Sequence, residues 1–236
     1  MKETVEKKPV TEFIPLSDDD FAIISSKRKK ALGCLERLHE SGLPAFTYGS
    51  ICRGDIREQS DIDIFIPRVV PSFRVELALE KYNFEERLIT QATPNHTIKG
   101  IIQLDTDLSV GFPLTPLKPL EEDFYVFAGK LDRTGLKNDL YVAGVNKRLE
   151  FISMETASKG YWKESLAGLN PLEVAKKLGT ALAIVEERIR VLTIRDEKGR
   201  KGIFLKKVVT DDFTFEQELK HLADRNPVVR RYLARF

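Results

Sequence analysis

Residues 48–67 combine a glycine-serine turn with two closely spaced aspartates. The segment reads YGSICRGDIREQSDIDIFIP. In it, Gly49-Ser50 ends a short apolar stretch, and Asp61-Ile62-Asp63-Ile64 follows after ten intervening residues. Because glycine has no side chain, the backbone of this turn can come close to a triphosphate. Adjacent amide groups and the serine hydroxyl can then bind the phosphate oxygens.

Asp61 and Asp63 alternate with isoleucines, which predicts a strand over residues 61–67 with both carboxylates on one face and Ile62 and Ile64 on the other. Adjacent carboxylates repel each other unless a divalent cation lies between them. Oxygen ligands of this kind suit Mg²⁺ or Mn²⁺. The pattern therefore indicates metal-assisted phosphoryl transfer. An ordinary turn beside a strand with two exposed aspartates is the alternative without chemistry.

These residues resemble the signature of the polymerase-beta-like nucleotidyltransferase superfamily, which is an apolar residue, Gly-Ser or Gly-Gly, a spacer, and Asp-apolar-Asp-apolar. Gly49, Ser50, Asp61 and Asp63 each match their place in it. The resemblance covers roughly residues 20–120. It implies an α+β fold with a mixed sheet and helices on one face, a bound nucleoside triphosphate, and two divalent ions, Mg²⁺ or Mn²⁺.

The family also needs a third carboxylate on a neighbouring strand, and residues 98–114 offer Asp105 and Asp107. Both fall on the face opposite the apolar residues of that stretch. Asp105 ends a clear apolar strand, whereas Asp107-Leu108-Ser109-Val110 resembles the family's Asp-apolar-x-apolar pattern. One of the two could instead form a tight turn. We place Asp105 first as the third metal ligand and keep Asp107 as the alternative catalytic aspartate.

The resemblance implies a role for each residue of the signature. Asp61 and Asp63 would hold both metal ions, and the third aspartate would hold the ion that lowers the pKa of the attacking hydroxyl. Gly49 and Ser50 would bind the triphosphate, so that attack on the α-phosphate releases pyrophosphate. Arg53 and Arg57, in the spacer, could add bidentate contacts to the phosphates or could be solvated loop residues.

The elements that must position these residues follow from capping and periodicity. Residues 1–16 are expected to form an arm or a short leading strand, residues 17–120 the catalytic domain, and residues 121–236 a smaller α+β region. The expected elements of the catalytic domain are a helix capped by Ser17 and stopped by Gly42, strands at 45–48 and 61–67, a helix at 71–82, and extended stretches at 84–92 and 98–114. The basic cluster 27–30 in the first helix is either a solvated face or a phosphate-facing patch.

The second region shows different patterns. We expect a hairpin formed by residues 124–130 and 140–145, an extended stretch at 148–153, a helix over 171–192, a basic turn at 198–202, and final helices starting at Thr214 and Asn226-Pro227. Arg225, Arg230, Arg231 and Arg235 gather near the end, where they could follow an RNA backbone or form a solvated helix face.

Composition excludes several classes of protein. The chain has 38 Lys plus Arg against 36 Asp plus Glu, a net charge of +2, which argues against a uniformly basic surface for nucleic acid. Two cysteines rule out a disulfide framework, and three scattered histidines make a zinc site unexpected. Cys52 has no histidine near it in sequence, which favours an inert thiol over a nucleophile. We expect no contact with membranes and a cytoplasmic location, since the charged N-terminal segment is unlike a signal peptide.

The acceptor of the nucleotide is left open by the sequence, and RNA, a small molecule and a protein side chain all stay possible. Ile98-Lys99-Gly100 is similar to a segment of archaeal CCA-adding enzymes, but the chain is far too short for their architecture. The predicted function is metal-dependent transfer of a nucleoside monophosphate from a triphosphate to a hydroxyl. The alternatives are a silent nucleotide- or RNA-binding module with the same fold and a structural protein whose aspartates are incidental.

Overall fold

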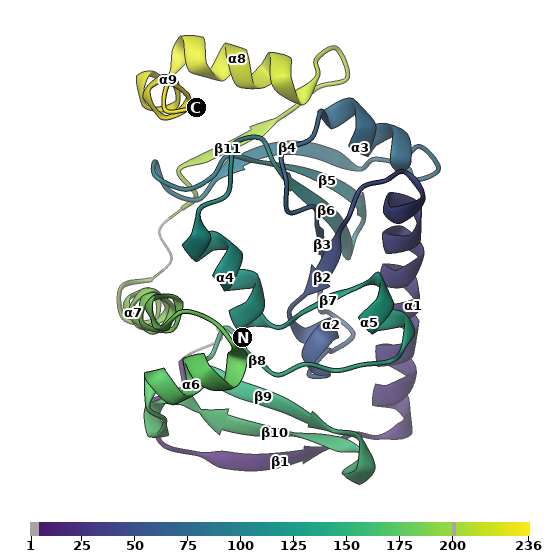
Figure 1. Ribbon diagram of the computed structural model, residues 1–236, viewed down its shortest axis with the longest axis vertical. Helices are drawn as coiled ribbons and strands as arrows, with labels where there is room; N and C mark the ends of the chain where they lie inside the picture. The colour runs from purple at the N-terminus through teal and green to yellow at the C-terminus, as the bar shows by residue number, and fades with distance from the viewer. Residues whose placement is uncertain (1–4, 200–201) are drawn as a thin grey trace. The chain divides into compact units, whose positions relative to one another are not determined.

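The computed structural model describes residues 5–199 and 202–236. The chain clusters into two compact units, each assembled from separate segments (Figure 1): unit 1 holds Met1–Leu32, Thr47–Ser60 and Pro119–Lys201, and unit 2 holds Gly33–Phe46, Asp61–Lys118 and Gly202–Phe236. The division at residue 120 stays a prediction, although one change of unit does come at Pro119.

The strands of unit 2 belong to a mixed sheet and lie in the order β11-β4-β5-β6-β3. The strands are β3 (Ile62–Phe65), β4 (Glu86–Gln91), β5 (Lys99–Asp105), β6 (Leu108–Pro113) and β11 (Leu205–Val208). β3 runs parallel to β6, while the other neighbouring pairs are antiparallel. Ile62 and Ile64 are buried, as their alternation predicted. The mixed-sheet α+β class expected from the sequence is confirmed.

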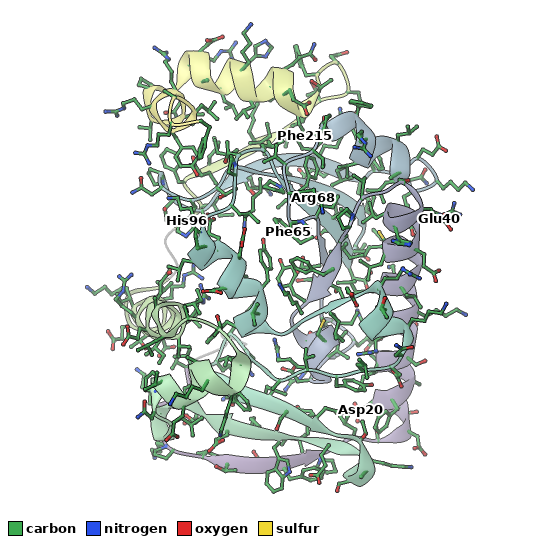
Figure 2. The ribbon with its side chains drawn as sticks, viewed as in Figure 1. Asp20, Glu40, Phe65, Arg68, His96 and Phe215 are labelled. Carbon is green, nitrogen blue, oxygen red and sulfur yellow. The ribbon has the colours of Figure 1, made fainter. Side chains whose placement is uncertain are left out.

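The helices of unit 2 are α3 (Ser72–Ala78), α8 (Phe215–Arg225) and α9 (Pro227–Leu233), together with the last residues of α1 (Asp18–Glu40). Two of them, α8 and α9, begin where their capping residues predicted, and the helix expected over 71–82 is shorter and ends at Ala78. Thr214 and Gln217 form a reciprocal capping box on α8, and the Asn226 side chain accepts from the first amides of α9. Phe215 packs edge-on against Phe112 with ring centroids 5.0 Å apart, which fixes α8 against the sheet (Figure 2).

Glu216 ties α8 to α3 through Ser72. Its carboxylate accepts from the Ser72 amide and from Ser72 Oγ, both at 2.7 Å. Burial raises the pKa of Glu216, but these hydrogen bonds outweigh it, so the pKa lies below its ordinary value of 4.5. A carboxyl with a lowered folded-state pKa stabilises the fold above its unfolded pKa and loses that contribution as the pH falls.

We therefore expect wild type to exceed Glu216→Gln in free energy of unfolding by a constant amount above about pH 5. The difference should shrink as the pH falls through and below 4.5. Urea denaturation at a series of pH values measures it. A pH-independent difference would contradict the role given to the carboxylate.

Unit 1 contains a four-stranded antiparallel sheet in the order β1-β10-β9-β8. Its strands are β1 (Thr11–Pro15), β8 (Gly144–Val145), β9 (Glu150–Glu155) and β10 (Gly160–Ser165). β2 (Phe46–Tyr48) and β7 (Lys130–Asp132) are neighbours of each other and do not belong to this four-stranded sheet. Part of the N-terminal arm is thus a strand. α1 begins after Ser17, whose hydroxyl and amide bind the Asp20 carboxylate and hold its pKa below the ordinary value (Figure 2).

The helices of unit 1 include three that the sequence did not predict, namely α2 (Ser50–Arg53), α4 (Pro119–Ala128) and α5 (Arg133–Lys137). Its further helices are α6 (Pro171–Leu178) and α7 (Leu182–Lys198), with short 3₁₀ turns at Thr156–Ser158 and Leu166–Gly168. The hairpin expected over 124–130 and 140–145 is wrong, because most of its first strand belongs to α4. Pro119 at the start and two glutamates in the first turn favour the helix, and Tyr125 and Phe127 are buried on it.

The helix expected over 171–192 is two helices. Gly179, with φ of +66°, ends α6 in the left-handed conformation, and α7 starts at Leu182. Residues of α4, β8, β9, α6 and α7 share one apolar core that includes Phe127, Phe151 and Val185. Part of the basic turn expected at 198–202 lies outside the described residues. Within the described part of the chain, no helix is both long and apolar enough to cross a bilayer.

Candidate active site

Asp61 and Asp63 stand at the beginning of β3 in unit 2. Asp61 is exposed and precedes the strand, and Asp63 is half-buried within it. The parallel register places Asp63 directly across from Ser109 on β6. Ser109 Oγ donates to Asp63 Oδ1 over 3.0 Å, which fixes one carboxylate oxygen of Asp63. Ser109 was not among the predicted site residues, although it is two positions beyond Asp107 and so shares its face.

The same register distinguishes the two candidates for a third carboxylate. Ile62 pairs with Leu108, and the Ile62 amide donates to the Asp107 carbonyl over 2.6 Å, so Asp107 precedes β6 as Asp61 precedes β3. Asp105 ends β5 beyond a register shift. Its Oδ1 accepts from the Thr106 amide (2.7 Å) and Oγ1 (3.2 Å) and so stabilises the turn between β5 and β6. The geometry favours Asp107, whereas the sequence placed Asp105 first.

The donor atoms here are those that Mg²⁺ and Mn²⁺ prefer, since Asp61, Asp63 and Asp107 offer only oxygen. Within residues 5–199 and 202–236, however, no three Asp, Glu, His or Cys side chains are grouped closely enough to hold a metal ion. The fit to a divalent ion therefore rests on two neighbouring carboxylates of β3. The third ligand stays a prediction.

Phe65, labelled in Figure 2, lies two residues beyond Asp63 on β3, so the two side chains lie on the same face of the strand. It pairs with Gly111 on β6, and a side chain at Gly111 would come within 3.1 Å of the Phe65 ring. Lys99 Nζ lies 5.2 Å from the centre of that ring. The glycine at position 111 thus leaves room for the Phe65 ring on the strand that carries Asp63, with the Lys99 ammonium group near the ring.

Gly49 and Ser50 lie in unit 1, at the junction of β2 and α2. Gly49 has φ of +89°, a conformation that side chains rarely adopt, and it precedes the first residue of α2. Its amide donates to the Gly129 carbonyl over 2.8 Å, and its carbonyl accepts from the Cys52 amide over 3.0 Å. The predicted Gly-Ser turn is therefore the entry to a helical turn, whose first amides are available as donors.

Arg53 is not a solvated loop residue, since it is only 5% exposed. Its Nε and Nη2 donate to the two Asp55 oxygens, each over 3.0 Å, and its Nη1 donates to the Ala128 carbonyl over 2.6 Å. These contacts hold the turn that contains Gly49 against the end of α4. Arg57 is exposed, so of the two spacer arginines it is the one whose position suits contact with a phosphate.

Part of the basic cluster of α1 supports the same turn. Arg28 Nη1 donates to the Ile51 carbonyl (2.9 Å) and Nη2 to the Leu140 carbonyl (2.6 Å), while Lys27 Nζ donates to the Ser60 carbonyl (2.7 Å). Lys27 and Arg28 are both buried. For these two residues the expectation of a solvated face is wrong, because they bind main-chain carbonyls of the segment that carries the signature.

Cys52 follows Ile51 within α2 and is fully buried, with its Sγ donating to the Thr47 carbonyl. Burial raises the pKa of this thiol to about 12, so it stays protonated at neutral pH. A protonated, inaccessible thiol is a poor nucleophile. The interpretation of Cys52 as an inert residue is supported.

Comparison with known proteins adds one assignment. Residues 28–141 match the family model described as a nucleotidyltransferase domain, a stretch that contains Gly49, Ser50, Asp61, Asp63 and both candidate third aspartates. No curated protein and no solved structure matches the chain. By this match and by the signature that they carry, residues 28–141 form a nucleotidyltransferase domain of the polymerase-beta-like superfamily.

Proposed function

We propose that this protein transfers a nucleoside monophosphate from a nucleoside triphosphate to an acceptor hydroxyl in a reaction that depends on Mg²⁺ or Mn²⁺. The family supports nucleotidyl transfer in general. The observation that carries the finer proposal is the pairing of β3 with β6, which aligns Asp61 and Asp63 with Asp107 and Ser109.

In this reaction the acceptor oxygen attacks the α-phosphorus in line. A new P–O bond forms, the bond to the β-phosphate oxygen breaks, and pyrophosphate leaves while the hydroxyl proton passes to solvent or a nearby base. Asp61 and Asp63 would hold the divalent ions, with Ser109 orienting Asp63. When bound, such ions neutralise phosphate charge and lower the pKa of the attacking hydroxyl. Gly49 and Ser50 would contact the triphosphate, with Arg57 as an additional cation.

A second candidate is a nucleotide- or RNA-binding module that has kept the fold without turnover. It is favoured by one observation: the described residues contain no group of three potential metal ligands. Under this alternative the chain binds a triphosphate and releases no pyrophosphate.

Pyrophosphate release by the full chain separates the two candidates. Each labelled triphosphate is incubated with Mg²⁺ and with separate pools of RNA, metabolites and proteins, and both pyrophosphate and transferred label are measured. We expect release with at least one pool and its loss when EDTA is added in excess of Mg²⁺. Binding of a triphosphate without pyrophosphate in any pool would favour the silent module. The pool that takes up label identifies the class of acceptor.

A further inference from the structure

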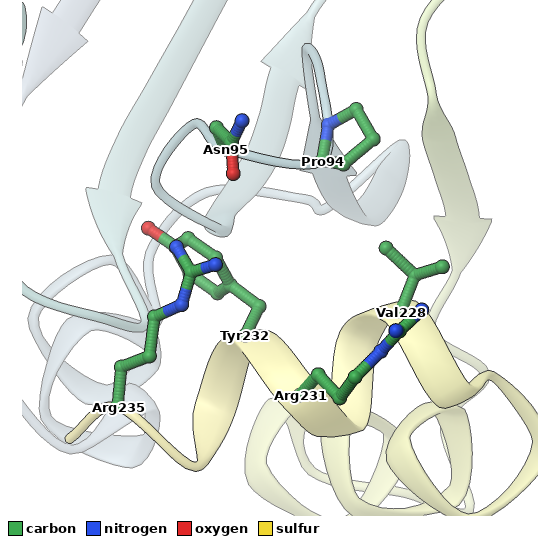
Figure 3. Close-up of a pocket in the computed structure, with 6 residues that line it drawn as sticks. All are labelled: Pro94, Asn95, Val228, Arg231, Tyr232 and Arg235. Carbon is green, nitrogen blue, oxygen red and sulfur yellow. The ribbon is translucent and has the colours of Figure 1, made fainter.

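A groove in unit 2 lies between α9 and the loop that joins β4 to β5 (Figure 3). It has a volume of about 190 Å³ and is open along one side. Its lining residues are Pro94, Asn95, Val228, Arg231, Tyr232 and Arg235. We call it the α9 groove.

The charge of the α9 groove is positive. Residues 225–236 contain four arginines and no aspartate or glutamate. Arg230 donates to the Ala223 and Asp224 carbonyls and so closes the end of α8. Arg231, whose Nε donates to the Pro227 carbonyl over 3.3 Å, and Arg235 line the groove, and neither forms an ion pair with a carboxylate among the described residues. Two exposed arginines four residues apart, Arg231 on α9 and Arg235 just beyond its end, favour an anionic ligand with more than one phosphate oxygen.

Tyr232 supplies a second, independent observation. Its side chain is 1% exposed, and its hydroxyl has no hydrogen-bond partner among the described residues. In Figure 3 this hydroxyl lies next to the guanidinium of Arg235. Buried hydroxyls normally have a partner. A phosphate oxygen bound by Arg235 would accept the Tyr232 hydrogen bond once the exposed arginine side chain moved aside.

Size and aromatic content indicate which kind of phosphate compound fits. Pockets for small molecules usually measure about 300–1,000 Å³, so this open groove is too small to enclose one. Phe236 is 64% exposed and its ring lies 5.6 Å from that of Tyr232. An exposed ring beside a row of cations is the arrangement on which single-stranded nucleic acids stack their bases.

We propose that the α9 groove binds the phosphate backbone of a single-stranded nucleic acid, with Arg231, Arg235 and Tyr232 contacting phosphate oxygens and Phe236 stacking on a base. That this strand is the acceptor of the transferred nucleotide rests on the proposed function. Binding to the groove itself does not depend on turnover.

The test is fluorescence anisotropy with the full chain, in EDTA and without triphosphate. The probes are labelled 12-nucleotide RNA and DNA strands without secondary structure, and inorganic phosphate serves as a competitor. For Arg231→Gln/Arg235→Gln we expect at least about tenfold weaker binding. The slope of log K against log salt should fall by about 1.4, since each single-strand phosphate contact contributes about 0.7. The control is Arg225→Gln. Arg225 is exposed at the end of α8 and does not line the groove, so this variant should change the affinity less than about twofold.

Tyr232→Phe removes only the unpartnered hydroxyl. We expect it to weaken strand binding severalfold without lowering the denaturation midpoint. The proposal is overturned if wild type binds neither strand, if the control variant loses as much affinity as the double variant, or if inorganic phosphate at low millimolar concentration displaces the strand completely. A strand that binds but never takes up label would contradict the proposed function and leave the groove assignment intact.

Discussion

Asp63→Asn is expected to lower the rate of magnesium-dependent pyrophosphate release by about 10³-fold or more. Asparagine has the shape of aspartate but lacks the charge that holds a divalent ion. The fold should survive, because the amide oxygen can still accept from Ser109 Oγ, which lies 3.0 Å from Asp63 Oδ1. Steady-state pyrophosphate release at saturating Mg²⁺ measures the effect, and an unchanged urea midpoint shows that the loss is chemical.

The third carboxylate is tested by the pair Asp107→Asn and Asp105→Asn. Asp107 stands beside the start of β3, so its variant should lose activity to a similar degree as Asp63→Asn. Asp105 stabilises the turn at Thr106, and the asparagine oxygen can still accept from the Thr106 amide, so its variant should stay within about twofold of wild-type activity because no metal ligand is lost. The reverse result would restore the assignment that the sequence placed first. If all three variants kept the wild-type rate of pyrophosphate release, none of these aspartates would take part in the reaction.

Arg53→Met is expected to lower the free energy of unfolding by about 3–5 kcal/mol. The methionine fills the space of the arginine stem but leaves the Asp55 carboxylate, whose side chain is 11% exposed, without its bidentate partner. It also removes the donor to the Ala128 carbonyl. Chemical denaturation monitored by circular dichroism measures the loss.

The control for this variant is Arg53→Met/Asp55→Leu, which removes both charges. Since most of the cost comes from one uncompensated buried charge, the double variant should recover most of the lost stability. If it is as unstable as the single variant, the hydrogen bond to Ala128 is the dominant contribution. Either variant should weaken triphosphate binding if Arg53 positions Gly49 and Ser50.

Local patterns were sufficient to predict the starts of α8 and α9, although the end of α6 at Gly179 was missed. Thr214 with Gln217 and Asn226 with Pro227 start helices where predicted, because the capping groups and the amides they bind lie within three residues. Likewise, the alternation of Ile62 and Ile64 correctly gave the buried face of β3. The match of residues 28–141 to a nucleotidyltransferase domain confirms the family that the signature suggested.

What failed depended on partners distant in sequence. Aromatic residues of α4 looked like those of a strand, and their burial against the rest of unit 1 is a tertiary effect. The burial of Arg28 and Arg53 could not be predicted from the sequence. The carbonyls to which they donate, those of Leu140 and Ala128, are distant in sequence and come close only in the folded chain. The parallel register of β3 and β6 joins residues 46 positions apart, so local alternation could not reveal it, and the choice between Asp105 and Asp107 stays a prediction.

The segmented make-up of the two units has a consequence for how the chain is made. Unit 1 needs residues from Pro119 onward, and unit 2 needs Gly202–Phe236, which supply β11 to the edge of its sheet at β4. During synthesis from the N-terminus, no early stretch therefore contains all of either unit. Unit 1 can therefore be completed only once Lys201 has been made, and unit 2 only once Gly202–Phe236 have followed. A ribosome stalled before β11 should present a chain that is still sensitive to protease throughout unit 2.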